Sequence, residues 1–212
     1  MISLFLDFDG TINDSSLRAY ESYSMATKRL GGIPIDYQGF LLNKRNGIEK
    51  SALLFRSGIE VSAVDMFDNY VLSFIEMESC LLLDRLYGWS LELLSAFSEL
   101  ELKLFLLTSR RRSDLLQRQI DNYFIREYFS EIFVESDKAA FLNSQDLEST
   151  CIIVGDTEAE IVAARRARIS CVSVSWGMRS RSFLSALNPE YLVDDFKDLL
   201  EIIGKKAIRK EQ

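Results

Sequence analysis

Hydrophobic and polar residues alternate with two different rhythms along this chain of 212 residues. Between residues 14 and 83 the apolar positions recur at helical spacing, and turn residues separate segments at about 36–44, 48–56 and 62–82. From residue 86 onward, helical stretches alternate with short apolar runs. This alternation indicates an α/β protein with a doubly wound parallel sheet and helices on both faces.

The apolar run at residues 2–6 differs from the helical stretch that follows it. It is nearly unbroken, which is typical of a strand buried on both faces of a parallel sheet. We therefore expect residues 1–13 and 84–212 to form one α/β core. Residues 14–83 are then a small all-helical domain inserted into it.

The later elements follow one another in a regular order. The basic tail from Gly204 to Gln212 is predicted to fray. The predicted strands cover about 102–107, a run beginning at Glu131, 151–155, 169–174 and 191–193, and the predicted helices cover about 90–100, 113–124, 138–147, 158–167 and 196–203.

Two acidic residues follow the first apolar run directly, in the motif Asp7-Phe-Asp9-Gly10-Thr11. A strand buried on both faces has no solvent side for acids, so we expect Asp7 and Asp9 at its carboxyl end, with both carboxylates pointing the same way. At about 4 Å and an effective dielectric constant near 20, two such charges repel by on the order of 4 kcal/mol. A cation, a shared proton or a ligand must offset a repulsion of that size, and we interpret the motif as a metal site.

Three later apolar runs also end in chemically distinctive residues. In open α/β sheets, ligands bind outside the carboxyl ends of the strands. The four strand ends together offer nucleophile candidates, hydroxyl donors, a cation and a further metal ligand. They are Asp7 with Asp9, Thr108 with Ser109, Lys138, and Gly155 with Asp156.

Composition removes several classes of function. The chain has no histidine, which excludes Ser-His-Asp and Cys-His catalysis and histidine zinc sites, so acid–base chemistry falls to carboxylates. A net charge of −7 argues against a general electrostatic grip on nucleic acid or an anionic membrane. Three widely spaced cysteines indicate a reducing compartment, and with no leader or membrane-spanning stretch in the sequence we expect a cytoplasmic location.

The four strand-end motifs, in this order, resemble those of the haloacid dehalogenase superfamily of aspartate-nucleophile phosphohydrolases. Asp7-Phe-Asp9-Gly-Thr is the most specific of them, and Val154-Gly-Asp156-Thr-Glu-Ala-Glu160 is nearly as specific. The helical insertion is similar to the cap domain of the phosphoglycolate phosphatase and β-phosphoglucomutase branch. The resemblance implies a Rossmann-like core that carries this cap. The chain departs from the family pattern at Ala139, where proline is usual after the lysine.

The resemblance also implies a mechanism. Asp7 would attack phosphorus and form an aspartyl-phosphate, while Asp9 would protonate the leaving oxygen and then activate water. Mg²⁺ would be held by Asp7, the backbone carbonyl of Asp9 and Asp156. Lys138 would offset the charge of Asp7 and the phosphate. The substrate phosphate would be bound by Gly10, Thr108, Ser109 and, from the cap, Arg45.

Two features of the sequence, Glu160 and a run of three arginines, each allow more than one interpretation. Glu160 fits either a Thr-x-x-Glu capping box that begins at Thr157 or support for the metal ligands. The run Arg110-Arg111-Arg112 resembles a phosphate clamp, but a charge run at the start of a helix is more often solvated.

We therefore predict a Mg²⁺-dependent phosphohydrolase that acts on a small phosphorylated metabolite, without nucleic acid or membrane partners. Asp9 argues against a haloalkanoic acid dehalogenase, which lacks the second acid. A sugar-phosphate mutase of the same family remains open, because it would differ only in the cap. A non-catalytic phosphate-binding or protein-interaction module is the alternative from another class. The sequence leaves the oligomeric state and the substrate open.

Overall fold

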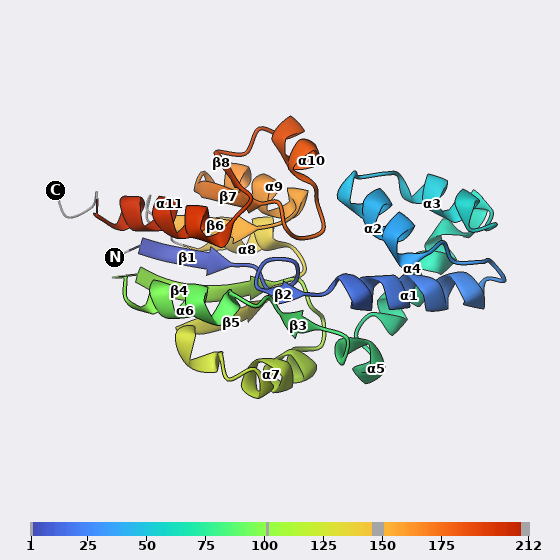
Figure 1. The fold of residues 1–212 in the computed structure, drawn as a ribbon, viewed down its shortest axis with the longest axis horizontal. Coiled ribbons are helices and arrows are strands. Elements are labelled where there is room, and N and C mark those ends of the chain that lie inside the picture. Colours follow the sequence, from blue (N-terminus) through green and yellow to red (C-terminus); the bar gives the residue numbers. More distant parts are fainter. Residues whose placement is uncertain (1, 101, 146–150, 209–212) are drawn as a thin grey trace. The chain divides into compact units, whose positions relative to one another are not determined.

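The structure is a computed structural model that describes residues 2–100, 102–145 and 151–208. The chain forms two compact units, one made of residues 1–13 and 86–212 and the other of residues 14–85. The short strands β2 (Asn13–Asp14) and β3 (Arg85–Leu86) pair where the chain passes from one unit to the other and back. Figure 1 shows the elements of both units.

The first unit contains a six-stranded sheet whose strand pairs are all parallel. The spatial order is β5-β4-β1-β6-β7-β8, so β1 is central and the strand order reverses beside it. This is the doubly wound arrangement in which ligands bind at the point of reversal. The strands are β1 (Ile2–Leu6), β4 (Leu102–Thr108), β5 (Glu131–Val134), β6 (Cys151–Gly155), β7 (Ser170–Val174) and β8 (Tyr191–Val193).

Helices cover both faces of this sheet, which confirms the predicted fold class (Figure 1). Alternate residues of β1 point to opposite faces. Leu4 and Leu6 pack with side chains of α6, α7 and α11, whereas Phe5 packs with side chains of α8, α9 and α10. The helices of the first face are α6 (Ser90–Ser98), α7 (Ser113–Asn122) and α11 (Phe196–Ile208), and those of the second are α8 (Lys138–Ser144), α9 (Glu158–Ala167) and α10 (Arg181–Ala186).

Burial of β1 fixes its position and therefore the position of the acids that follow it. Leu4 and Leu6 have no exposed surface. Truncating one fully buried leucine to alanine costs about 2–5 kcal/mol, a large part of the stability of a typical domain. The strand is therefore a rigid support for the chain at Asp7.

The second unit is helical between its two end strands. Its core is largely aromatic: Tyr23 stacks on Phe40 with ring centroids 4.8 Å apart, and Leu54 is fully buried beside them. A buried ion pair joins the Arg18 Nε and an Asp84 carboxylate oxygen at 3.0 Å. The helices are α1 (Ser16–Arg29), α2 (Tyr37–Arg45), α3 (Lys50–Arg56), α4 (Val64–Phe74) and α5 (Glu78–Leu81), with a 3-10 turn at Val61–Ala63.

Some predicted boundaries were wrong. The segment 62–82, predicted as one helix, is broken between α4 and α5, because the chain turns extended at Met77 with ψ 144°. Helix α11 continues to Ile208, so the first part of the tail is helical rather than frayed, since its apolar residues continue the helical spacing. Helix α8 ends at Ser144, and the rest of that predicted helix lies outside the described residues.

Candidate active site

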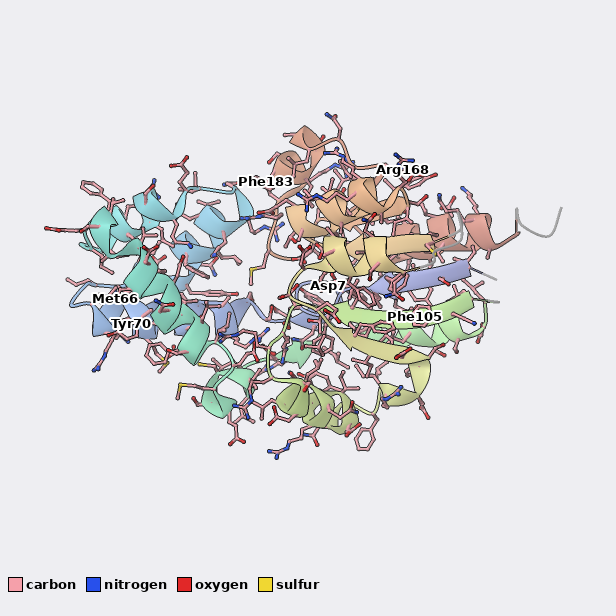
Figure 2. All side chains as sticks on the ribbon, turned by 180° about the vertical axis from the view of Figure 1, so that it is seen from behind. Asp7, Met66, Tyr70, Phe105, Arg168 and Phe183 are labelled. Carbon is pink, nitrogen blue, oxygen red and sulfur yellow. The ribbon has the colours of Figure 1, made fainter. Side chains whose placement is uncertain are left out.

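The carboxyl ends of three neighbouring strands bring the predicted residues to one edge of the sheet. Leu6 of β1 is level with Leu106 of β4 and with Val154 of β6. The chain leaves each strand within two residues of these positions, so Thr108, the last residue of β4, lies at the same edge as Asp7 and Asp156, which directly follow β1 and β6. Figure 2 shows Asp7 at the end of β1.

Lys138, the first residue of α8, joins two of the acids. Its Nζ donates to the Oδ1 of Asp7 and to the Oε1 of Glu160, the latter at 2.6 Å. All three side chains are buried. The resemblance implies that Lys138 offsets the charge of Asp7 and of the phosphate. Glu160 is a second carboxylate on the same ammonium group.

Glu160 also caps α9. Its Oε2 accepts from the backbone N of Thr157 at 3.2 Å and from the Thr157 hydroxyl at 2.7 Å, and the reciprocal capping box is complete. The capping interpretation is therefore confirmed, while its other oxygen holds Lys138. One side chain links the start of a helix to the lysine.

Asp156 is pressed between two segments of backbone. A methyl group built on Gly10 would lie 2.1 Å from the Asp156 Oδ2, and one built on Gly177 would lie 2.2 Å from it. Gly10 also has a φ of +81°, so both conformation and space require glycine there. The backbone N of Met178 donates to Oδ2 at 2.5 Å, whereas Oδ1 is buried without a hydrogen-bond partner. A buried carboxylate oxygen in that state is expected to meet a ligand.

Burial and crowding perturb these acids strongly. Burial raises the pKa of Asp7 to about 7, because it outweighs the opposing attraction of Lys138, and Glu160 adds to the rise. Burial, followed by the charges of Asp7 and Glu160, raises the pKa of Asp156 well above its usual value. Burial would lower the pKa of Lys138, but Asp7 and Glu160 raise it overall, so the ammonium form is retained. Three carboxyl groups thus share one cation.

Asp9 has different surroundings from Asp7. Its Oδ1 accepts from Asn13 Nδ2 at 2.9 Å and from the Arg110 NH2 at 2.7 Å, and its Oδ2 accepts from Arg110 Nε at 2.8 Å. Arg110 is buried, and its guanidinium lies 5.1 Å from the ring centre of Phe8. The expectation of a solvated arginine run was wrong for Arg110, because the run turns one of its members inward to a carboxylate.

A comparison with known proteins identifies the family. The sequence profile of the haloacid dehalogenase-like hydrolases matches residues 4–174. The chain belongs to this family. The resemblance noted in the sequence is thus confirmed over most of the chain.

Individual members of the haloacid dehalogenase-like hydrolases are similar to the chain over different lengths. The pyrophosphatase PpaX of Oceanobacillus iheyensis is 32% identical over 53 residues, which cover 25% of each chain. The alignment thus spans about a quarter of that relative. Among solved structures, a protein of Clostridium acetobutylicum titled a predicted phosphatase has a TM-score of 0.77 at 17% identity, covering 96% of this chain and 98% of that one. One of Haemophilus somnus, titled a predicted phosphoglycolate phosphatase, has a TM-score of 0.72 at 21% identity, covering 95% and 97%.

The other predicted site residues lie in different settings. Thr108 is buried at the end of β4, and its carbonyl accepts from the backbone N of Glu135 at 2.8 Å. Ser109, the next residue, is exposed. Arg45 is half-buried at the end of α2 in the helical unit. Substrate binding by these residues stays a prediction.

The buried carboxylates of Asp7 and Asp156 are candidate metal ligands. Within residues 2–100, 102–145 and 151–208, no three His, Cys, Asp or Glu side chains gather as a metal-binding group. Across the same part of the chain, no helix combines the length and the apolar character needed to span a bilayer.

Proposed function

We propose that this hydrolase is a phosphatase that cleaves small-molecule phosphomonoesters, with Asp7 as the nucleophile. The observation that carries the proposal is the buried Asp7 carboxylate, which Lys138 holds by one oxygen at the point where the strand order reverses. A nucleophile fixed in this way faces the edge at which such sheets bind ligands.

The chemistry follows from the two oxygens of Asp7. Lys138 holds Oδ1. An oxygen of Asp7 forms a bond to phosphorus as the bond from phosphorus to the leaving oxygen breaks, and water then hydrolyses the aspartyl-phosphate. Lys138 offsets the negative charge that Asp7 and the phosphoryl group bring together. Its second bond, to Glu160, keeps the ammonium group in place.

Asp9 is the proposed acid and base. It gives a proton to the leaving oxygen in the first step and takes one from water in the second, so the same residue serves both. Its carboxylate is held by Asn13 and Arg110 rather than by Lys138. The nucleophile and the acid–base group therefore have separate supports.

The residues at this edge fit a divalent cation of the Mg²⁺ type. Asp156 keeps a buried oxygen without a hydrogen-bond partner, and burial together with Asp7 and Glu160 raises its pKa. Asp7, Asp156 and the backbone carbonyl of Asp9 would hold the ion, which suits Mg²⁺ because it keeps several of its waters. When bound, it supplies positive charge that stabilises the phosphoryl oxygens.

Possible substrates differ in the group that leaves the phosphorus atom. The similarity to the pyrophosphatase PpaX covers a quarter of the chain and adds pyrophosphate to the substrates that merit testing. A panel of phosphorylated sugars, nucleotides, small acids and pyrophosphate, assayed with Mg²⁺, would rank them by kcat/KM.

Trapping of the intermediate tests the nucleophile. Asp9→Asn keeps Asp7 but lacks the base, so mixing it with acetyl phosphate should add one phosphoryl group to a peptide that contains Asp7, detected by mass spectrometry. Asp7→Asn should show no label and no turnover. Asp121→Asn, which changes an exposed acid of α7, should resemble the wild type. A label on Thr108 or Ser109 would overturn the assignment of Asp7.

A further inference from the structure

We propose that Arg110 is a positioning residue that sets the orientation of the Asp9 carboxylate, and that helix α7 braces it. The proposal rests on the proposed function, because it concerns how Asp9 is presented to the reaction. It gives one member of the arginine run a role that neither solvation nor phosphate binding describes.

The first observation is the geometry of the pair. Arg110 approaches Asp9 through two nitrogens, with Nε on Oδ2 at 2.8 Å and NH2 on Oδ1 at 2.7 Å. Two parallel bonds of this kind fix the plane of a carboxylate as well as its position. Asn13 adds a third bond, to Oδ1 at 2.9 Å. Rotation of the Asp9 side chain would break all three bonds at once.

The second observation is a closed ring of hydrogen bonds through α7. Arg110 NH1 donates to Gln119 Oε1 at 2.7 Å, and Gln119 Nε2 donates to the Tyr123 hydroxyl at 3.0 Å. The Tyr123 hydroxyl donates to Asn13 Oδ1 at 3.3 Å, and Asn13 returns to Asp9. Five side chains thus form the ring, and four of them brace the Asp9 carboxylate. Within this ring, Gln119 bonds to Arg110 and to Tyr123, and both of these lead on to Asp9.

The third observation separates positioning from phosphate binding. The side chain of Arg110 is 3% exposed, against 24% for Asp9, so in this pair the carboxylate is the more accessible partner. The guanidinium also lies over the Phe8 ring, 5.1 Å from its centre, and Phe8 is fully buried. Its nitrogens are directed at Asp9 and Gln119. Arg110 therefore supports the residue that faces the substrate.

The ring predicts a specific kinetic defect. In Arg110→Met, Asp9 remains but its direction is no longer fixed, and a misplacement of about 1 Å is enough to reduce a rate on the order of a hundredfold. We expect kcat to fall on that order with little change in KM. Hydrolysis of the aspartyl-phosphate needs Asp9, so the variant should accumulate phosphorylated enzyme with acetyl phosphate. Arg110→Lys should lose an intermediate amount, because lysine supplies the charge without the two-pronged geometry.

A double-mutant cycle shows whether Arg110 acts through Asp9. If it does, Arg110→Met in the Asp9→Asn background should lower the rate no further, because the residue it positions is already inactive. Gln119→Met should show the same pattern at smaller amplitude and provides a second variant if Arg110→Met does not fold. Gln117→Met, an exposed change on the same helix, should leave kcat and the amount of phosphorylated enzyme unchanged.

Two results would overturn the proposal. A rise in KM with kcat unchanged would make Arg110 a substrate-binding group. Additive losses in the cycle would mean that it acts independently of Asp9. Both outcomes leave the Asp7 label intact, whereas absence of that label in Asp9→Asn would count against the proposed function itself.

Discussion

Each unit of the molecule buries a group of charged side chains. The two groups differ in the ratio of positive to negative charges. In the helical unit, Arg18 and Asp84 form a pair with side chains 4% and 0% exposed. In the sheet unit, Lys138 serves Asp7 and Glu160, and Asp156 lies close enough to be affected by both acids. In the helical unit one arginine faces one carboxylate, and in the sheet unit one lysine lies among three carboxylates.

The difference in balance corresponds to a difference in role. A matched buried pair neutralises its own charge, and its net contribution to stability is small because desolvation opposes the attraction. An excess of buried carboxylates is destabilising until another positive group arrives. Burial, and after it the neighbouring acids, raises the pKa of Asp7 to about 7 and the pKa of Asp156 well above its usual value. Buried charge without balance therefore marks a ligand site better than buried charge alone.

The largest expected effect is the loss of activity when divalent cations are removed. The excess negative charge around Asp7 and Asp156 should then repel the substrate phosphate as well. Exhaustive chelation should abolish turnover, and Mg²⁺ should restore it. Ca²⁺ should not, because its larger coordination number allows Asp7 to bind through both oxygens. Phosphate release measures the result. Full turnover after chelation would contradict the idea that the excess of buried carboxylates marks a cation site.

Breaking the balanced pair should change stability and leave the chemistry alone. Arg18→Met removes the cation beside the buried Asp84, which should lower the free energy of unfolding by about 3–5 kcal/mol. Arg18→Met combined with Asp84→Leu should recover most or all of that loss. Urea unfolding followed by circular dichroism measures both. A double variant as unstable as the single one would show that the pair is not self-contained.

Removing the single cation of the unbalanced group should change the rate. Lys138→Met should lower kcat by a hundredfold or more, on the order of 3 kcal/mol, because Asp7 and the phosphate then approach without it. Lys103→Met, an exposed lysine of β4, is the matched control and should keep the wild-type rate. A near wild-type rate for Lys138→Met would place the positive charge of the site elsewhere.

A smaller effect should appear in stability as a function of pH. Burial and the neighbouring acids raise the pKa of Asp156 on folding, so the folded protein loses stability as the pH rises above the unfolded value of 3.8. Asp156→Asn lacks this penalty, which grows by about 1.4 kcal/mol for each pH unit until the folded pKa is reached. In chelator, its Tm should exceed that of the wild type at pH 8, and the gap should shrink toward pH 4.

Magnesium provides the control for that experiment. Mg²⁺ should raise the Tm of the wild type at pH 8 and have little effect on Asp156→Asn, since the variant lacks one of the two carboxylates. If the Tm of the wild type does not fall relative to that of Asp156→Asn as the pH rises, ionisation of Asp156 does not reduce the stability of the folded protein.

The sequence predicted the fold class because buried strands leave a clear signal. The unbroken run at residues 2–6 and the acids at its end required no knowledge of the other strands. Contacts between residues that are far apart in the sequence left no recognisable pattern in it. Arg110 lies 101 residues from Asp9, and nothing in the arginine run distinguishes the member that turns inward. The backbone N of Met178 and the close approach of Gly177 to Asp156 were likewise invisible, because they depend on how the loop after β7 returns to the sheet.

The central place of β1 has a consequence for how the protein folds during synthesis. Its partners, β4 and β6, begin at Leu102 and Cys151, so the strand that leads to Asp7 is made about a hundred residues before the first of them. At about 5–20 residues per second, it waits roughly 5 to 20 seconds with its apolar edges unpaired. The helical unit, made of local contacts between residues 14 and 85, can form during that interval. We therefore expect the nascent chain to be most prone to aggregation just before β4 is complete.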